Sequence, residues 1–337
     1  MFDNPRTRFL DFFHFASPGA GRPRRGLPSG RLAPARRISA WILLIGLPAC
    51  TLGGCTPRSA GTVEDTVTSG RILIVCATEA MTLIARGRDA FVEHYPEAAI
   101  EVRAAPSRDG IRSLFAAECD LAVITRELEP SERGAAVRGG LELEGYRFAR
   151  DAVVMVVHPG NRMENMALEE LRRVYDGRTL RWSELGGADL AIEPVIQQPE
   201  ADVTEFFVQH VMNGQPIRAR ARYESSDSTV VAAVASRPGA IGYVSLAWAD
   251  RGAKALRLAS LAGLPYHKPD AESVYRGDYP LTRFLNLYAR PDSPRLANGF
   301  ITFMTSIEGQ RIVRESGLIP TTVPVRFVRR SGMQSTH

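Results

Sequence analysis

The sequence is poor in cysteine and histidine, which contribute only 4 and 6 of its 337 residues. It has no Gly-x-Ser-x-Gly turn and no glycine-rich loop of the kind that cradles phosphates. No histidine stands at metal-ligand spacing from a cysteine or a glutamate. The six histidines are His14, His94, His158, His210, His267 and His337. These absences argue against a zinc centre and a serine hydrolase, so we expect no enzymatic activity, no metal and no cofactor.

Two of the cysteines fall in the body of the chain. Cys76 ends one strand-like run, whereas Cys119 begins another. If those strands are parallel neighbours, the two sulfurs lie at opposite ends and beyond disulfide reach. We therefore expect two buried free thiols.

A basic folded surface is also missing. The formal net charge is +5, but residues 1–54 hold eight arginines and two aspartates, a net of +6, which leaves −1 for the rest. A nucleic-acid-binding protein keeps its basic surface on the folded body. We therefore exclude nucleic acid as a partner.

The N-terminal region has the layout of an export signal. The apolar segment Ile38–Gly54 follows Arg36 and Arg37, the order typical of a secretory signal peptide, and it is marginal in length for spanning a membrane. It ends in Leu52-Gly53-Gly54-Cys55, which resembles the lipobox of bacterial lipoproteins and implies acylation of Cys55. Leu47-Pro48-Ala49-Cys50 is a weaker second candidate. The alternative is an uncleaved signal anchor.

Beyond the leader, apolar runs alternate as strand, helix, strand, helix, strand from Ile72 to Thr125, which indicates an α/β fold with a parallel sheet and helices on both faces. A second unit begins at the apolar strand Asp151–His158, and Tyr279–Ala289 is a strand that returns to the first unit. A long helix is expected over Pro294–Glu315. We divide the chain into a signal peptide (1–54), a flexible tether (55–69), a first lobe (70–150 and 279–328), an inserted second lobe (151–278) and a polar tail (329–337).

Several stretches resemble the periplasmic phosphate-binding protein family, the substrate-binding components of phosphate ABC importers. The most specific is Ala232–Leu246 (AAVASRPGAIGYVSL), against the family's A-V-x-x-x-P-G-A-I-G-Y-V. Weaker matches are Asp120–Leu128, Asp151–Pro159, Leu168–Gly187, Tyr279–Arg283 and Ser306–Gly317. The resemblance covers about residues 70–325 in consistent order.

This resemblance implies a two-lobed type 2 periplasmic-binding-protein fold with two hinge crossings, in which a solute binds between the lobes and stabilises their closure. It also implies an exported monomer at the periplasm or cell surface that delivers its solute to an ABC permease. A lipid anchor would hold such a protein at the membrane.

In that family, helix N-termini and hydroxyls from three loops hold the phosphate, because unsatisfied N–H groups at a helix start favour negative charge. The resemblance places Thr78 and Glu79 in the first loop, Ser107 in the second, and Thr125 and Arg126 at the end of the third strand. Glu79 is either a ligand contact or a charge that complements a helix dipole. Arg126 contacts either an anion or a surface acid.

The third loop departs from the family. Its G-S-G-T-R-x-T-F aligns with Pro199–Phe206, so that Glu200 replaces the serine, Asp202 the threonine and Val203 the arginine. Two carboxylates would repel a buried phosphate. The ligand is therefore phosphate by resemblance, or a cationic or neutral solute by this chemistry. An envelope sensor that no longer transports is a further alternative.

The hydroxyl-rich segment Ser225–Thr229 forms a fourth candidate loop. This segment, with Asp227, either lines the cleft, or Asp227 or Ser228 caps the helix that follows.

Overall fold

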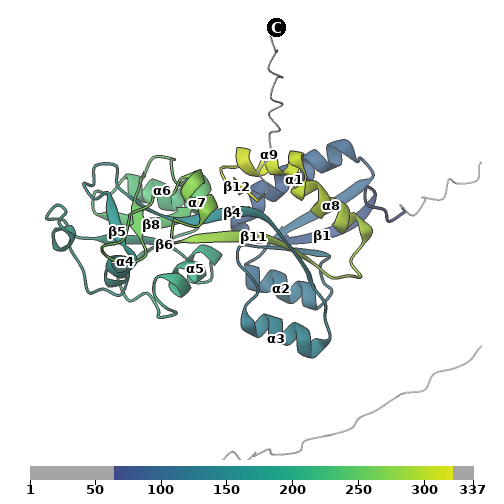
Figure 1. Cartoon of the computed structure of the whole chain (residues 1–337), viewed down its shortest axis with the longest axis horizontal. Coiled ribbons are helices and arrows are strands. Elements are labelled where there is room, and N and C mark those ends of the chain that lie inside the picture. The colour runs from purple at the N-terminus through teal and green to yellow at the C-terminus, as the bar shows by residue number, and fades with distance from the viewer. Residues whose placement is uncertain (1–63, 322–337) are drawn as a thin grey trace, which may run out of the picture. The chain divides into compact units, whose positions relative to one another are not determined.

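The computed structural model describes residues 64–321, which form one α/β body around a ten-stranded sheet of order β2-β1-β3-β11-β4-β8-β6-β7, with β12 and β9 also paired to β4 (Figure 1). Its strands are β1 Gly70–Cys76, β2 Ala98–Ala104, β3 Leu121–Ile124, β4 Glu144–Val157, β6 Glu193–Gln197, β7 Arg222–Glu224, β8 Ala240–Ser245, β9 Lys254–Ala255, β11 Thr282–Ala289 and β12 Ile319–Pro320. The short strands β5 (Asn165–Ala167) and β10 (Arg257–Ala259) pair with each other. The predicted signal peptide, Cys55 and the polar tail lie outside the described residues.

The first lobe is built on the parallel strands β2, β1 and β3. Helices α1 (Met81–His94), α8 (Arg295–Thr305) and α9 (Ile307–Glu315) cover one face of this sheet, and α2 (Ser107–Phe115) and α3 (Pro130–Gly139) lie on the other (Figure 1). Alternating side chains of β1 serve the two faces: Ile72 and Ile74 pack with the α1 side, and Val75 with α2. The period-2 pattern of the strand therefore builds two separate apolar layers.

The second lobe is built on the parallel strands β8, β6 and β7. Its helices are α4 (Leu168–Tyr175), α5 (Asp202–His210), α6 (Asp227–Ala235) and α7 (Ala271–Arg276). Trp182 and Tyr243 are both buried, and the Tyr243 ring stacks on Phe207 at 4.3 Å between centroids. Gly242 is required by space, because a Cβ there would lie 2.8 Å from the carbonyl oxygen of Val195.

Strands β4 and β11 join the two lobes. The first part of β4 pairs antiparallel with β11, and its last five residues, Val153–Val157, pair antiparallel with β8. The sheet is therefore mixed: the outer strands of each lobe are parallel, and the crossing strands are antiparallel. The predicted α/β class with helices on both faces is confirmed.

One predicted helix was wrong, and the start of another helix bears on the candidate site. Helix α2 begins at Ser107, which is therefore the first residue of that helix. The expected long helix Pro294–Glu315 is two helices, broken at Ser306, whose backbone is extended and whose hydroxyl accepts from the N–H of Gly309 at 3.4 Å. Helices α3 and α7 were not predicted.

Cys76 and Cys119 are both free and buried, as expected. Within residues 64–321, none of the helices combines the length and the apolar character that a membrane span needs.

Candidate functional site

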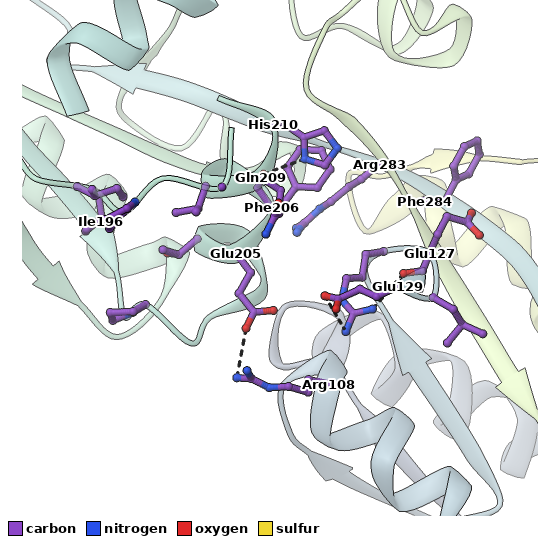
Figure 2. Close-up of a pocket in the computed structure, with 18 of the residues that line it drawn as sticks. Arg108, Glu127, Glu129, Ile196, Glu205, Phe206, Gln209, His210, Arg283 and Phe284 are labelled. Carbon is purple, nitrogen blue, oxygen red and sulfur yellow. Dashed lines mark hydrogen bonds and ion pairs between the residues drawn. The ribbon is translucent and has the colours of Figure 1, made fainter. Parts of the chain in front are cut away.

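A cavity of about 920 Å³ lies between the two lobes, and both of them line it (Figure 2). The segment around β11 forms its inner wall with Arg283 and Phe284. The first lobe contributes Arg108, Arg126, Glu127, Leu128, Glu129 and Pro130, and the second contributes, among others, Ile196, Thr204, Glu205, Phe206, Ile217 and Tyr223. The body therefore has an inter-lobe cleft of the size that holds small organic ligands.

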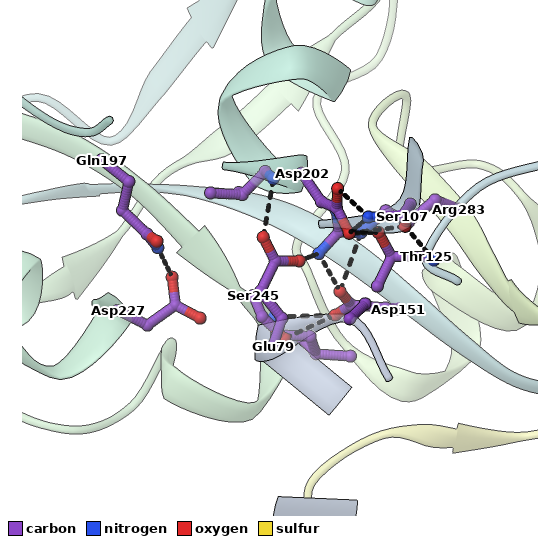
Figure 3. Close-up of polar contacts among 12 residues, drawn as sticks. Glu79, Ser107, Thr125, Asp151, Gln197, Asp202, Asp227, Ser245 and Arg283 are labelled. Carbon is purple, nitrogen blue, oxygen red and sulfur yellow. Dashed lines mark hydrogen bonds and ion pairs between the residues drawn. The ribbon is translucent and has the colours of Figure 1, made fainter. Parts of the chain in front are cut away.

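Next to this cavity, a buried carboxylate crosses from the second lobe to the first (Figure 3). Asp202, the first residue of α5, accepts hydrogen bonds from the Ser107 N–H at 2.9 Å, from Ser107 Oγ at 2.5 Å and from Thr125 Oγ1 at 3.2 Å. Ser107 begins α2, and its N–H is one of the amides that a helix start leaves without an intrahelical partner. The Asp202 carboxylate thus receives the donors that suit a small bound anion.

A second carboxylate crosses in the opposite direction. Glu79 lies in the 3-10 turn Thr78–Ala80 of the first lobe, and its Oε1 accepts from the N–H of Val203 at 2.7 Å, at the start of α5. Its other oxygen pairs with Arg283. Each lobe therefore supplies a carboxylate to a helix start of the other lobe.

Arg283 and Asp151 fix this arrangement to the crossing strands. The two residues lie opposite each other in the β4–β11 ladder, and Arg283 donates to Asp151 Oδ2 from Nε at 3.0 Å and from Nη2 at 2.8 Å. The other oxygen of Asp151 accepts from Ser245 Oγ and from the N–H of Leu246. Arg283 Nη1 is buried and has no hydrogen-bond partner within residues 64–321.

Carboxyls outnumber cations in this cluster. Burial raises the pKa of Glu79 to about 7. The charge of Arg283 lowers this pKa, whereas the charges of Asp202 and Asp151 raise it further. Burial, together with the charges of Glu79 and Asp151, likewise raises the pKa of Asp227 to about 8. The site therefore resists further negative charge and takes up protons near neutral pH.

The structure brings together four of the predicted ligand residues: Glu79, Ser107, Thr125 and Asp202. Glu79 does complement a helix start, but that of α5 rather than that of its own helix. Thr78 and Glu200 are exposed and lie outside the contacts described above.

Arg126 forms a two-point ion pair with Glu132, with both N···O distances at 2.8 Å, so the acid alternative applies to it. Asp227 is buried and accepts from Gln197 Nε2 at 2.7 Å, whereas Ser226 is the residue that caps α6. Asp227 is therefore a buried neighbour of the cluster rather than a helix cap.

Sequence reasoning missed Asp151 and Arg283. A signal existed, because Asp151 heads the apolar run DAVVMVVH and Arg283 interrupts the apolar strand that follows Tyr279. Buried charges are rare unless they are paired. Two such residues in different strands were candidates for one ion pair. Among the described residues, no group of three or more His, Cys, Asp or Glu is placed to hold a metal ion.

Comparisons with known proteins agree with this architecture. The chain is 28% identical over 260 residues to the phosphate-binding protein PstS of Bacillus subtilis, covering 75% of this chain and 82% of that protein. It is 23% identical over 274 residues to PstS of Pseudomonas aeruginosa, covering 76% and 85%. Both relatives are named as binding proteins, in agreement with the expectation that this chain is not an enzyme.

Solved structures show the same fold. An ABC-type phosphate transport receptor from Vibrio cholerae superposes with a TM-score of 0.64 at 22% identity, covering 74% of this chain and 99% of that one. PstS from Borrelia burgdorferi gives a TM-score of 0.57 at 21% identity, with 75% and 99% covered. The PBP superfamily domain matches residues 61–308, and the chain belongs to this superfamily.

Proposed function

We propose that this chain is an exported solute-binding protein of an ABC-type importer, and that its cleft binds a solute other than inorganic phosphate. The import role is supported by its superfamily and by the phosphate-binding proteins to which it is similar. The change of solute rests on one observation: the Asp202 carboxylate takes up the donors of Ser107 and Thr125.

A phosphate in this part of the cleft would meet electrostatic repulsion from Asp202. Two unit charges of the same sign at 4 Å repel by about 4 kcal/mol at an effective dielectric constant of about 20. That amount corresponds to roughly a thousandfold in affinity, because each 1.4 kcal/mol is about tenfold. Phosphate would have to displace Asp202 or bind beside it, and the buried guanidinium of Arg283 is already shared by Glu79 and Asp151.

The open part of the cleft suits an organic solute. Its walls combine apolar surface, such as Phe206, Ile217 and Phe284, with arginines that are already paired to carboxylates. Neutral or cationic solutes avoid the repulsion from the acidic cluster at its inner end. We therefore place the solute in the 920 Å³ cavity, beside the anion-type site.

Isothermal titration calorimetry of the purified full chain with inorganic phosphate tests this proposal. The protein is first unfolded and refolded to remove any bound ligand. We expect no binding heat up to millimolar phosphate. Binding at micromolar phosphate would refute the change of solute and would return the protein to the ligand of its relatives.

A second candidate is an envelope sensor or interaction module that does not transport. It is favoured by the contacts that Asp202 and Glu79 make across the cleft, since they bridge the lobes without a solute. Gene order separates the two: permease and ATPase genes beside this one support import, and their absence supports the sensor.

We also propose that the exported protein is a monomer held at the membrane by lipid on Cys55, a residue outside the described range. The support is the apolar segment followed by Leu52-Gly53-Gly54-Cys55. Replacing Cys55 by alanine should move the protein from the membrane fraction to the soluble fraction. A Cys55→Ala protein that still sediments with membrane would refute the lipid anchor.

A further inference from the structure

Asp202 makes the contacts that a bound anion would make. We infer that Asp202 is an internal ligand: its carboxylate occupies the anion site of the cleft, and its removal opens that site to free inorganic phosphate. This inference deepens the proposed function, on which it rests, by assigning the exclusion of phosphate to one residue.

The donors around Asp202 are oriented toward an anion. Ser107 Oγ accepts a hydrogen bond from the Thr125 N–H at 3.1 Å, so its own proton is free to point at Asp202 Oδ2, 2.5 Å away. Ser107 and Thr125 are 0% and 1% exposed. With Asp202 gone, two hydroxyls and a helix-start N–H would be buried without an acceptor, which is costly. The site therefore demands an anionic or polar replacement.

An independent observation comes from Arg283. Its side chain is 1% exposed, and its Nη1 has no hydrogen-bond partner in the part of the chain that the structure describes, although the guanidinium lies 5.6 Å from the centre of the Phe206 ring. The guanidinium lies at the inner end of the cleft, where it lines the cavity (Figure 2). The carboxylates of the cluster therefore leave one donor nitrogen of Arg283 unused. A phosphate has four acceptor oxygens, against two for a carboxylate, and so has more oxygens available for such donors.

The same loop provides a matched comparison. Glu200 and Asp202 are two residues apart and carry the same charge, and both replace hydroxyl residues of the resembling family. Glu200 is exposed, whereas Asp202 is 7% exposed and bound to the opposite lobe. If the buried charge beside Ser107 and Thr125 excludes phosphate, replacing Asp202 should raise the affinity for phosphate, and replacing Glu200 should not.

Asp202 also bridges the lobes. It belongs to α5 of the second lobe, whereas Ser107 and Thr125 belong to the first. A free anion bound to Ser107 and Thr125 would restore that bridge only when present. In the Asp202→Thr protein, the bridge through Ser107 and Thr125 should therefore depend on phosphate, while the hydrogen bond between Glu79 and the Val203 N–H remains.

The test is calorimetry with inorganic phosphate on three full-chain proteins: wild type, Asp202→Thr and the control Glu200→Thr. We expect Asp202→Thr to bind phosphate at least a hundredfold more tightly than wild type, and Glu200→Thr to behave as wild type. Thermal unfolding with and without phosphate gives a second readout, in which only Asp202→Thr should gain stability.

The outcomes separate this inference from the proposed function. A folded Asp202→Thr protein that binds no phosphate overturns the inference and leaves the proposed function standing. Tight phosphate binding by the wild-type protein overturns both the inference and the proposed function. A gain in phosphate affinity in Glu200→Thr equal to that in Asp202→Thr overturns the specific role of Asp202 and leaves the proposed function standing. If Asp202→Thr fails to fold, the measurement is made on Asp202→Asn, which keeps the shape of the side chain and removes its charge. A gain in phosphate affinity of less than tenfold in Asp202→Asn would then refute the inference.

Discussion

The inner and outer parts of the cleft contain the same kinds of charged side chains in opposite surroundings. At the inner end, the side chains of Arg283 and Asp151 are 1% and 3% exposed and lie 2.8 Å apart. In the outer part, Arg108 and Glu205 are 53% and 25% exposed and lie 3.3 Å apart. An exposed ion pair contributes little to stability, whereas removing one partner of a buried pair leaves a charge without compensation. The inner part is therefore a fixed structural unit, and the outer part is free to adapt to a solute.

The largest expected effect comes from breaking the inner pair. Arg283→Met leaves the carboxylates of Asp151 and Glu79 buried without their cation. We expect it to lower the free energy of unfolding by about 3–5 kcal/mol. The matched outer variant Arg108→Met should cost less than about 1 kcal/mol. Urea unfolding of both variants at neutral pH measures the difference.

If Arg283→Met and Arg108→Met lose the same free energy of unfolding, the inner ion pair is no more important for stability than the outer one. A stable Arg283→Met protein would mean that Glu79, whose pKa burial already raises, is protonated when the guanidinium is absent. Repeating the measurement at higher pH, where Glu79 must ionise, would then reveal the penalty.

Much of the fold was predictable because the patterns that specify it are local. The apolar period of β1 and the alternation of strands with helices identified an α/β sheet covered on both faces. The break at Ser306 was not predictable from periodicity, because α8 and α9 continue one apolar pattern on either side of an extended residue. The backbone turn there also needs Gly309, whose Cβ would lie 2.3 Å from the Phe303 carbonyl oxygen.

The candidate site was predictable in part. Resemblance located Ser107, Thr125 and Asp202, and the carboxylates of the third loop raised the question of whether phosphate still binds. That Asp202 itself accepts the hydrogen bonds of Ser107 and Thr125 depends on how the two lobes meet, which no local pattern encodes. The pairing of Asp151 with Arg283 likewise depends on the register between β4 and β11, strands far apart in the sequence.

A smaller effect, visible only as a function of pH, distinguishes Glu79 from the exposed carboxylates of the outer cleft. Its pKa in the folded protein is about 7, above the ordinary 4.5. Between these two pKa values the folded state holds a proton that the unfolded state releases. The protonated carboxyl therefore stabilises the folded state at low pH, and this contribution is lost as the pH rises from about 4.5 through 7. Glu79→Gln removes the titration, so its stability relative to wild type should rise by about 3 kcal/mol from pH 5 to pH 8.

Chemical unfolding at several pH values measures that change, with Glu127→Gln as the control. Glu127 lines the same cavity but is exposed and pairs with Arg147 near the surface. Because the charge of Glu79 helps to raise the pKa of Asp227 to about 8, the proteins are compared in an Asp227→Asn background, which removes this second titration. A flat difference between Glu79→Gln and wild type would mean that Arg283 keeps Glu79 ionised throughout. The inner cleft would then carry permanent negative charge, and its repulsion of anions would be independent of pH.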